Sequence, residues 1–137
     1  MKNRLARTAQ KGVMLLEALI GILIFSIGIL AMVAMQAQSI AYVSDANYRS
    51  EASFLANQIL AQMWVDRANM ANYAMPGGSA AALAPWVAKV NFALPGTAAN
   101  PPTIQVNAGE ATVTIFWQPP NATTVHSHLA VATIVNP

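Results

Sequence analysis

Two histidines near the C-terminal end have side chains and a spacing that suit metal binding. His126 and His128 are separated by Ser127, so on a β-strand both imidazoles point to one face and the serine hydroxyl points to the other. A structural metal site usually takes four ligands, and no third ligand lies near these two in sequence. The alternation also disfavours a local Ser–His catalytic pair. We therefore expect two strand-surface histidines and no metal site.

Other residue types that carry catalysis are scarce. The chain of 137 residues has no cysteine, which excludes disulfides, thiolate zinc sites, iron–sulfur clusters and a cysteine nucleophile. It has neither a glycine-rich phosphate loop nor a paired-carboxylate motif, and Gly77-Gly78 is interpreted as a helix stop. We therefore expect no enzymatic activity, no cofactor and no small-molecule substrate. The carboxylates of the whole chain are Glu17, Asp45, Glu51, Asp66 and Glu110.

Glu17 is the carboxylate whose position most strongly indicates a function. It stands at the start of a run, residues 18–44, that carries no charged side chain. A charge at the middle of a bilayer costs about 2.5 kcal/mol or more, and less near the interface. No basic residue follows Glu17 within a helical turn, and Lys11 precedes it by six positions. Glu17 therefore needs a partner, and snorkelling to the membrane interface is the alternative interpretation.

The apolar run is long enough to cross a membrane. A spanning helix needs about 20 residues, and residues 13–38 satisfy this length. Four of the seven Lys and Arg residues lie in the first eleven positions, so the positive-inside rule places the N-terminus in the cytoplasm and the C-terminal body across the membrane. A cleaved secretory signal is one alternative, but the apolar run is long for it, and no clear small-x-small cleavage site follows before the helix continues. A plain signal anchor is another, and it leaves Glu17 unexplained.

The residues around Glu17 resemble the processing site of type IV prepilins and pseudopilins. The segment KGVMLLE, from Lys11 to Glu17, ends a short basic leader with glycine and places glutamate at the fifth position of an apolar helix. The resemblance implies that a prepilin peptidase cuts between Gly12 and Val13 and methylates the new N-terminus of Val13. It also implies that the Glu17 carboxylate meets the N-terminal ammonium of a neighbouring subunit. Opposite charges attract strongly at low dielectric, whereas either charge buried alone is costly.

The sequence also resembles the PilV-type minor pilins, and this similarity covers about residues 11–70 well and the rest of the chain loosely. It is carried by the run LLEALIGILIFSIGIL and by YRSEASFLANQ at residues 48–58. Two positions depart from the wider family: Val13 stands where Phe is usual, and Ala34 stands where major pilins often have Pro. The resemblance implies a minor subunit of the bacterial inner membrane with a periplasmic head. Such a subunit joins a pilus fibre beside the major pilin and other minor pilins, helps to initiate pilus assembly, and supports twitching motility.

One long helix is expected to carry these residues. Beyond the membrane segment, an amphipathic stripe at helical spacing predicts contact with a small domain. Asp45 and Arg49 are four apart, which suits an exposed helical ion pair. No proline precedes Pro76, so the helix is predicted from residue 13 to about residue 73, a length of about 90 Å. The residues of the stripe are Tyr48, Ala52, Leu55, Ile59 and Met63.

The rest of the chain has strand and turn patterns. Residues 89–94, 103–107 and 110–117 alternate between apolar and polar side chains, and residues 124–135 are rich in β-branched types. Residues 79–88 are ambiguous, and a tight turn is expected at Ala108-Gly109. These patterns predict a three- or four-stranded antiparallel meander that packs on the helical stripe. The three tryptophans, Trp64, Trp86 and Trp117, are expected in this core or in a subunit contact.

These patterns predict an α+β fold, and the resemblance implies that this fold is pilin-like. The predicted organisation is a cleaved leader at residues 1–12, a transmembrane and filament-core helix at 13–38, an amphipathic helix half at 39–75 and a small β-rich head at 76–137.

The composition of the chain beyond the predicted leader restricts its possible functions. Apolar residues make up 55% and charged residues 9%, against about 25% charged in average proteins. Only three cations lie beyond residue 12, so no nucleic-acid partner is expected. Asp66 and Arg67 are expected to be solvated.

Two alternatives stay open: a minor pseudopilin of a type II secretion system, and a membrane-anchored periplasmic enzyme or ligand-binding domain. The second alternative requires a cleft with convergent polar groups, for which the region after Pro76 is small and poor in charge.

Overall fold

A computed structural model describes residues 4–120 and 122–134, with side chains from residue 12 onwards. The chain divides into two units, Met1–Val43 and Ser44–Pro137. One helix, α1 (Arg4–Val65), contributes to both units, and the second unit also contains the folded head. The predicted α+β class is confirmed, because long helical structure and a separate antiparallel sheet both occur.

The long helix ends earlier than predicted. α1 stops at Val65, and a 3-10 helix, η1 (Arg67–Tyr73), follows instead of further α-helix. Asp66 lies between them with non-helical backbone angles (φ −105°, ψ 38°), and its carboxylate accepts hydrogen bonds from Asn69 and Tyr73. Aspartate side chains that bond to nearby groups compete with the continuation of a helix. The α-helix therefore ends before Pro76 and the glycines that follow it.

The glycines after Pro76 have a different role from the predicted one. Gly77 and Gly78 do not stop α1 but form part of the turn that leads to the next helix. Gly77 has φ +105°, which favours glycine. A Cβ on Gly78 would collide with the backbone carbonyl oxygens of Asn72 and Ala74. The two glycines thus allow the chain to reverse closely over the end of η1.

A helix replaces the strand predicted at residues 89–94. α2 (Leu83–Ala93) includes most of this segment, and its Phe92 is 95% exposed. The prediction was wrong because a short apolar alternation does not by itself distinguish strand from helix. The buried residues of α2 recur at helical spacing instead: Leu83, Trp86 and Val90.

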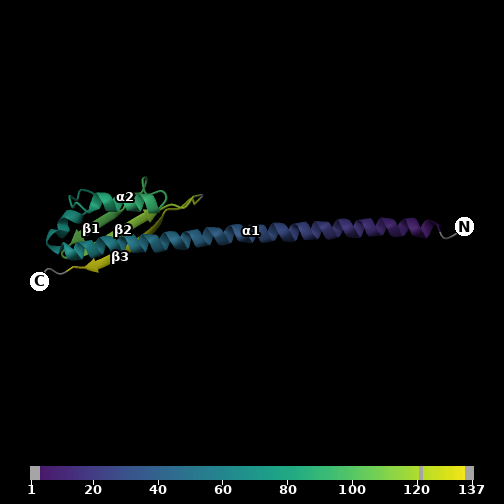
Figure 1. The fold of residues 1–137 in the computed structure, drawn as a ribbon, viewed down its shortest axis with the longest axis horizontal. Helices are drawn as coiled ribbons and strands as arrows, with labels where there is room; N and C mark the ends of the chain where they lie inside the picture. Colours follow the sequence, from purple (N-terminus) through teal and green to yellow (C-terminus); the bar gives the residue numbers. More distant parts are fainter. Residues whose placement is uncertain (1–3, 121, 135–137) are drawn as a thin grey trace. The chain divides into compact units, whose positions relative to one another are not determined.

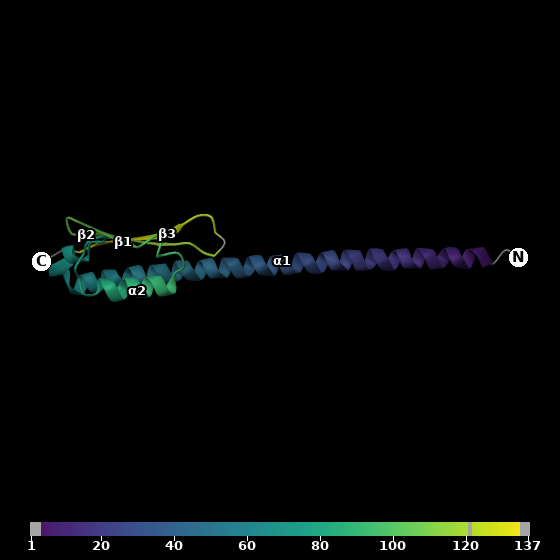
Figure 2. The same ribbon diagram turned by 90° about the horizontal axis from the view of Figure 1, so that it is seen from above.

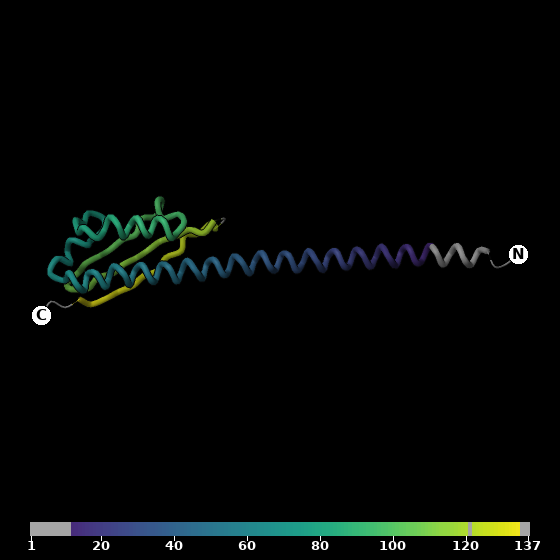
Figure 3. Tube along the Cα trace, in the orientation of Figure 1, coloured from purple at the N-terminus to yellow at the C-terminus, as the bar shows by residue number. Residues whose placement is uncertain are grey.

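The head has two layers. The C-terminal part of α1 and the antiparallel α2 lie side by side on one face of a three-stranded sheet, as the two ribbon views show (Figures 1 and 2). The trace in Figure 3 follows the reversal from α1 through η1 into α2. The buried indole N–H of Trp86 donates a hydrogen bond of 2.9 Å to the Leu55 carbonyl oxygen of α1. This bond joins the two helices within one layer.

The sheet confirms the predicted meander with three strands. β1 (Thr103–Asn107), β2 (Glu110–Trp117) and β3 (His126–Thr133) are antiparallel neighbours in chain order. The β1–β2 turn lies at the predicted Ala108-Gly109, where both residues have positive φ, as tight hairpin turns require. Met75 closes the outer edge of β1 through two backbone hydrogen bonds with Ile104, of 2.8 and 3.2 Å.

The core lies between the helices and the sheet. The predicted faces of β2 are confirmed, because alternate residues from Ala111 to Trp117 are buried. Trp86 and Trp117 belong to this core, whereas Trp64 is exposed. The predicted helical stripe faces the core as well, with only Tyr48 at its edge partly exposed. The buried residues of α1 are Ala52, Leu55, Ala56, Ile59, Leu60 and Met63.

Candidate functional site

Within the unit Met1–Val43, the side chains that the structure describes, from residue 12 onwards, form an apolar helical surface. Every described side chain from residue 12 to residue 43 is exposed, and the most apolar window of the helix Gly12–Val65 has no buried share. This helix is long and apolar enough to cross a membrane. The Ser26 hydroxyl donates to the Ile22 carbonyl at 2.7 Å, so this polar group is satisfied within the helix. The unit therefore has the chemistry of a surface covered by lipid or by other helices.

The predicted processing and assembly residues all lie within α1, which is continuous through this segment. Gly12, Val13 and Glu17 are all exposed, and a Cβ at Gly12 would meet nothing within 4 Å. Val13 and Glu17 are four residues apart and therefore share one helix face. Glu17 forms no ion pair with any side chain that the structure describes. The basic side chains of the predicted leader, within residues 1–11, lie outside the described side chains.

The two histidines occupy a different setting from the predicted one. Among the described residues, no group of three or more His, Cys, Asp or Glu side chains is placed to hold a metal ion. His126 is not a free surface residue, because its Nδ1 lies 3.1 Å from the Asp45 Oδ1 of α1. The two atoms are buried but not aligned for a hydrogen bond. Ser127 is exposed on the opposite face, as predicted, and His128 is half-buried on the face of His126.

Arg49 and Trp117 adjoin the His126–Asp45 contact and form a cluster with it. Arg49 Nε donates to Asp45 Oδ2 at 3.0 Å, which confirms the predicted helical ion pair. The Trp117 ring lies 5.7 Å from the His126 ring, centroid to centroid, at an angle of 56°. The cluster connects the start of β3 to α1 and thus has a structural role in the head.

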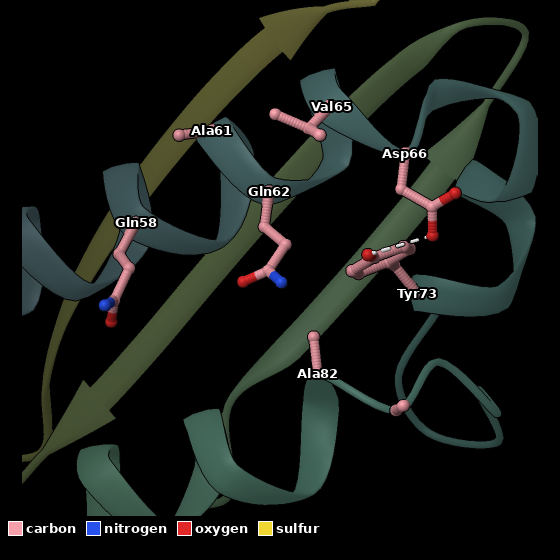
Figure 4. Close-up of a pocket in the computed structure, with 8 residues that line it drawn as sticks. Gln58, Ala61, Gln62, Val65, Asp66, Tyr73 and Ala82 are labelled. Carbon is pink, nitrogen blue, oxygen red and sulfur yellow. Dashed lines mark hydrogen bonds between the residues drawn. The ribbon is translucent and has the colours of Figure 1, made fainter.

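A pocket lies where α1, η1 and α2 meet (Figure 4). Its volume is about 520 Å³, within the usual range for ligand pockets. Polar groups reach it from α1 and η1, and alanines and a valine form its walls. This cleft was not expected in a head so small and poor in charge. The lining residues are Gln58, Ala61, Gln62, Val65, Asp66, Tyr73, Ala81 and Ala82.

Asp66 and Tyr73 are the titratable pair of this pocket. Asp66 was predicted to be solvated but is half-buried, because its Oδ1 accepts from Asn69 Nδ2 at 2.7 Å and its Oδ2 accepts from the Tyr73 hydroxyl at 3.2 Å. Burial raises the pKa of Tyr73 above 10.0, and the hydrogen bond and negative charge of Asp66 raise it further. The phenol therefore stays protonated and remains a donor. Arg67 is exposed, as predicted.

The raised pKa of Tyr73 predicts how the stability of the head depends on alkaline pH. The folded state holds the Tyr73 proton more tightly than the unfolded state does. The protonated hydroxyl therefore contributes its full stabilisation below about pH 10, and this stabilisation is lost as the pH rises through the pKa of the folded state. We expect the unfolding midpoint of the full chain to fall more steeply above pH 10 than that of Tyr73→Phe. Thermal unfolding of both proteins in micelles, measured across that range, checks this. If the unfolding midpoints of the two proteins fall equally steeply above pH 10, the raised pKa of Tyr73 is contradicted.

Sequence reasoning missed this pocket because its parts are dispersed along the chain. Gln58 and Gln62 carry no charge and form no motif, and Tyr73 lies beyond the predicted helical stripe. The only local signal was an aspartate at a helix end, which often bonds to neighbouring groups. A search of protein-family models, curated proteins and solved structures finds no match to this chain.

Proposed function

We propose that this protein is a minor pilin of a type IV pilus. In this proposal it is held in the bacterial inner membrane by its apolar helix, with the head in the periplasm. A prepilin peptidase removes residues 1–12, and the mature chain enters a fibre with the major pilin and other minor pilins, where it helps to initiate assembly. The observation that carries the proposal is the apolar segment of α1 at residues 12–43, where every side chain is exposed and the one carboxylate is Glu17, five residues after Gly12.

The exposed apolar segment of α1 needs a covering that excludes water. The apolar side chains of residues 12–43 are exposed on all sides, and moving them out of water is favourable by roughly 25 cal/mol per Å² of apolar surface. Lipid covers them before assembly, and neighbouring helices cover them in a fibre. A plain membrane anchor has no use for Glu17. A filament subunit uses it, because the N-terminal ammonium of a neighbour supplies the opposite charge.

The first experiment measures the intact mass and the N-terminal sequence of the chain. It compares cells that carry the natural prepilin peptidase with cells that lack it. We expect loss of residues 1–12 and one added methyl group on Val13 only when the peptidase is present. An uncut chain that begins at Met1 in both strains would make the protein a plain anchor. A cut after the apolar run would identify a secreted head and exclude the filament.

A minor pseudopilin of a type II secretion system would give the same mass. Deletion of the gene separates the two functions, because loss of twitching motility supports the pilus and loss of protein secretion supports the pseudopilin.

A further inference from the structure

An open groove runs between α1 and α2 of the head. At the end of α2 it widens into a cavity of about 590 Å³, with walls that come from both helices. Phe54 of α1 and Phe92 of α2 line this cavity, and their side chains are 61% and 95% exposed. Exposed apolar side chains that gather at one concave site are typical of a contact surface. The groove therefore has the character of an interface that the described residues leave uncovered.

One carboxylate and one ammonium group stand at this cavity. Glu51 lies on the α1 wall and Lys89 on the α2 wall. Neither of them forms an ion pair with any side chain within residues 12–120 and 122–134. A surface with one charge of each sign on opposite walls is complementary to a copy of itself, because a two-fold axis brings the unlike charges together twice. We propose that this groove binds the same groove of a second copy of the chain.

The positions of the two charges decide the direction of the two-fold axis. With an axis parallel to α1, the α1 wall of each copy faces the α2 wall of the other. Glu51 of each copy then meets Lys89 of the other copy at the same level of the groove. An axis across the helices would place α1 against α1 and bring the two Glu51 carboxylates together, and like charges at an interface are unfavourable. The axis is therefore parallel to α1.

The same axis buries the two exposed phenyl rings. Phe54 and Phe92 line one cavity, so each ring faces the opposite wall of the second copy at the level of the ion pairs. Ala88, which also lines the cavity, leaves room for a ring there. Because α1 and α2 are antiparallel (Figure 2), each helix in the pair has antiparallel neighbours, as in a four-helix bundle. The removal of the rings from water favours this association.

This pairing suits chains that are held in one membrane. The α1 helices of the two copies run in the same direction, as two chains anchored through the same end of this helix require. A contact that takes in one groove of each head is small, and small interfaces give weak complexes. Confinement to a membrane raises the effective concentration of the copies, so we expect pairs in lipid and single chains in a large excess of micelles. The shared membrane rests on the proposed function, whereas the chemistry of the groove does not.

The test measures Förster energy transfer between full-length chains in phosphatidylcholine vesicles. Because the chain has no cysteine, Thr133→Cys provides a unique thiol for a donor or an acceptor dye, on the exposed face of β3 in the other layer of the head. We expect energy transfer above that of randomly distributed chains, which is lost as the chains are diluted with lipid. Transfer no greater than the random level at every dilution would overturn the second copy as the occupant of the groove.

Charge reversal makes the test specific for the groove. Glu51→Lys alone and Lys89→Glu alone each bring like charges together twice, so each should raise the chain density at half-maximal transfer at least about fivefold. A mixture of Glu51→Lys donor chains with Lys89→Glu acceptor chains should return to the original density, because every contact again joins opposite charges. This recovery cannot arise from misfolding. An unchanged density in either single variant, or no recovery in the mixture, would overturn the proposal.

A second pair of variants tests the apolar part of the contact. Phe92→Ala should weaken the pairing by a similar factor, whereas Leu129→Ala, which shortens an exposed apolar side chain of β3, should leave it unchanged. Equal effects of these two variants would contradict the groove contact. Normal N-terminal processing without pairing would reject the dimer alone, whereas charge-dependent pairing of a chain that the peptidase never cuts would reject the pilin function alone.

Discussion

Chains in which Glu17 is replaced by glutamine are expected to reach the membrane normally but to be at least about tenfold scarcer in sheared fibres. Glutamine keeps the size and most of the polarity of the side chain but cannot form an ion pair. At an effective dielectric constant of 20, two unit charges 4 Å apart attract by about 4 kcal/mol, and a factor of ten corresponds to about 1.4 kcal/mol. Immunoblots of membrane and fibre fractions measure the ratio.

A matched control separates the charge from its position. Glu110→Gln removes a carboxylate of the same kind from the exposed first residue of β2 and should leave the fibre fraction unchanged. Peptidase processing of the Glu17→Gln chain is measured in the same samples by mass. If the variant is processed and enters fibres at the normal level, Glu17 has no role in assembly and the snorkelling interpretation takes its place.

The head is expected to lose about 3 kcal/mol of unfolding free energy when Ile59 is replaced by alanine. Ile59 is 1% exposed and belongs to the core between α1 and the sheet. The variant loses the transfer free energy of the deleted atoms and leaves a cavity that the surrounding side chains fill only partly. Denaturant unfolding of the full chain in micelles, followed by the fluorescence of Trp86 and Trp117 in the same core, measures the change.

The matched control for this variant is Phe92→Ala on α2. This side chain is larger but 95% exposed, so its removal should change the free energy of unfolding by no more than about 0.5 kcal/mol. A larger loss for Phe92→Ala than for Ile59→Ala would contradict the described core.

Local sequence patterns predicted correctly those elements that depend on interactions between residues close together in the sequence. The β1–β2 hairpin was predicted correctly, because alternating side chains and the Ala108-Gly109 turn both act over a few residues. The helical stripe that contains Ile59 was predicted for the same reason, since period and burial agree along one helix. The strand expected at residues 89–94 was wrong, because six residues support either period and the packing of Trp86 on α1 decides for helix.

The processing segment and the pocket also differ in how far they could be predicted from the sequence. Gly12, Val13 and Glu17 occupy one short segment, so residue type and spacing alone were sufficient to single them out. Their function as a processing and assembly site stays a prediction. The pocket could not be predicted, because it forms only when the chain turns at Asp66, reverses over Gly77 and Gly78, and places α2 beside α1.

The sequence by itself therefore determined the apolar helix with its lone carboxylate, the antiparallel hairpin and the inward face of the amphipathic helix, since each depends on periodicity and on local backbone preferences. Only the tertiary structure decided where α1 ends, that residues 83–93 are helical, that His126 lies against Asp45, and that Gln58, Asp66 and Tyr73 share a pocket. These features depend on contacts between segments far apart in the chain. Such contacts override local propensity because they bury apolar side chains and provide the hydrogen-bond partners of polar ones.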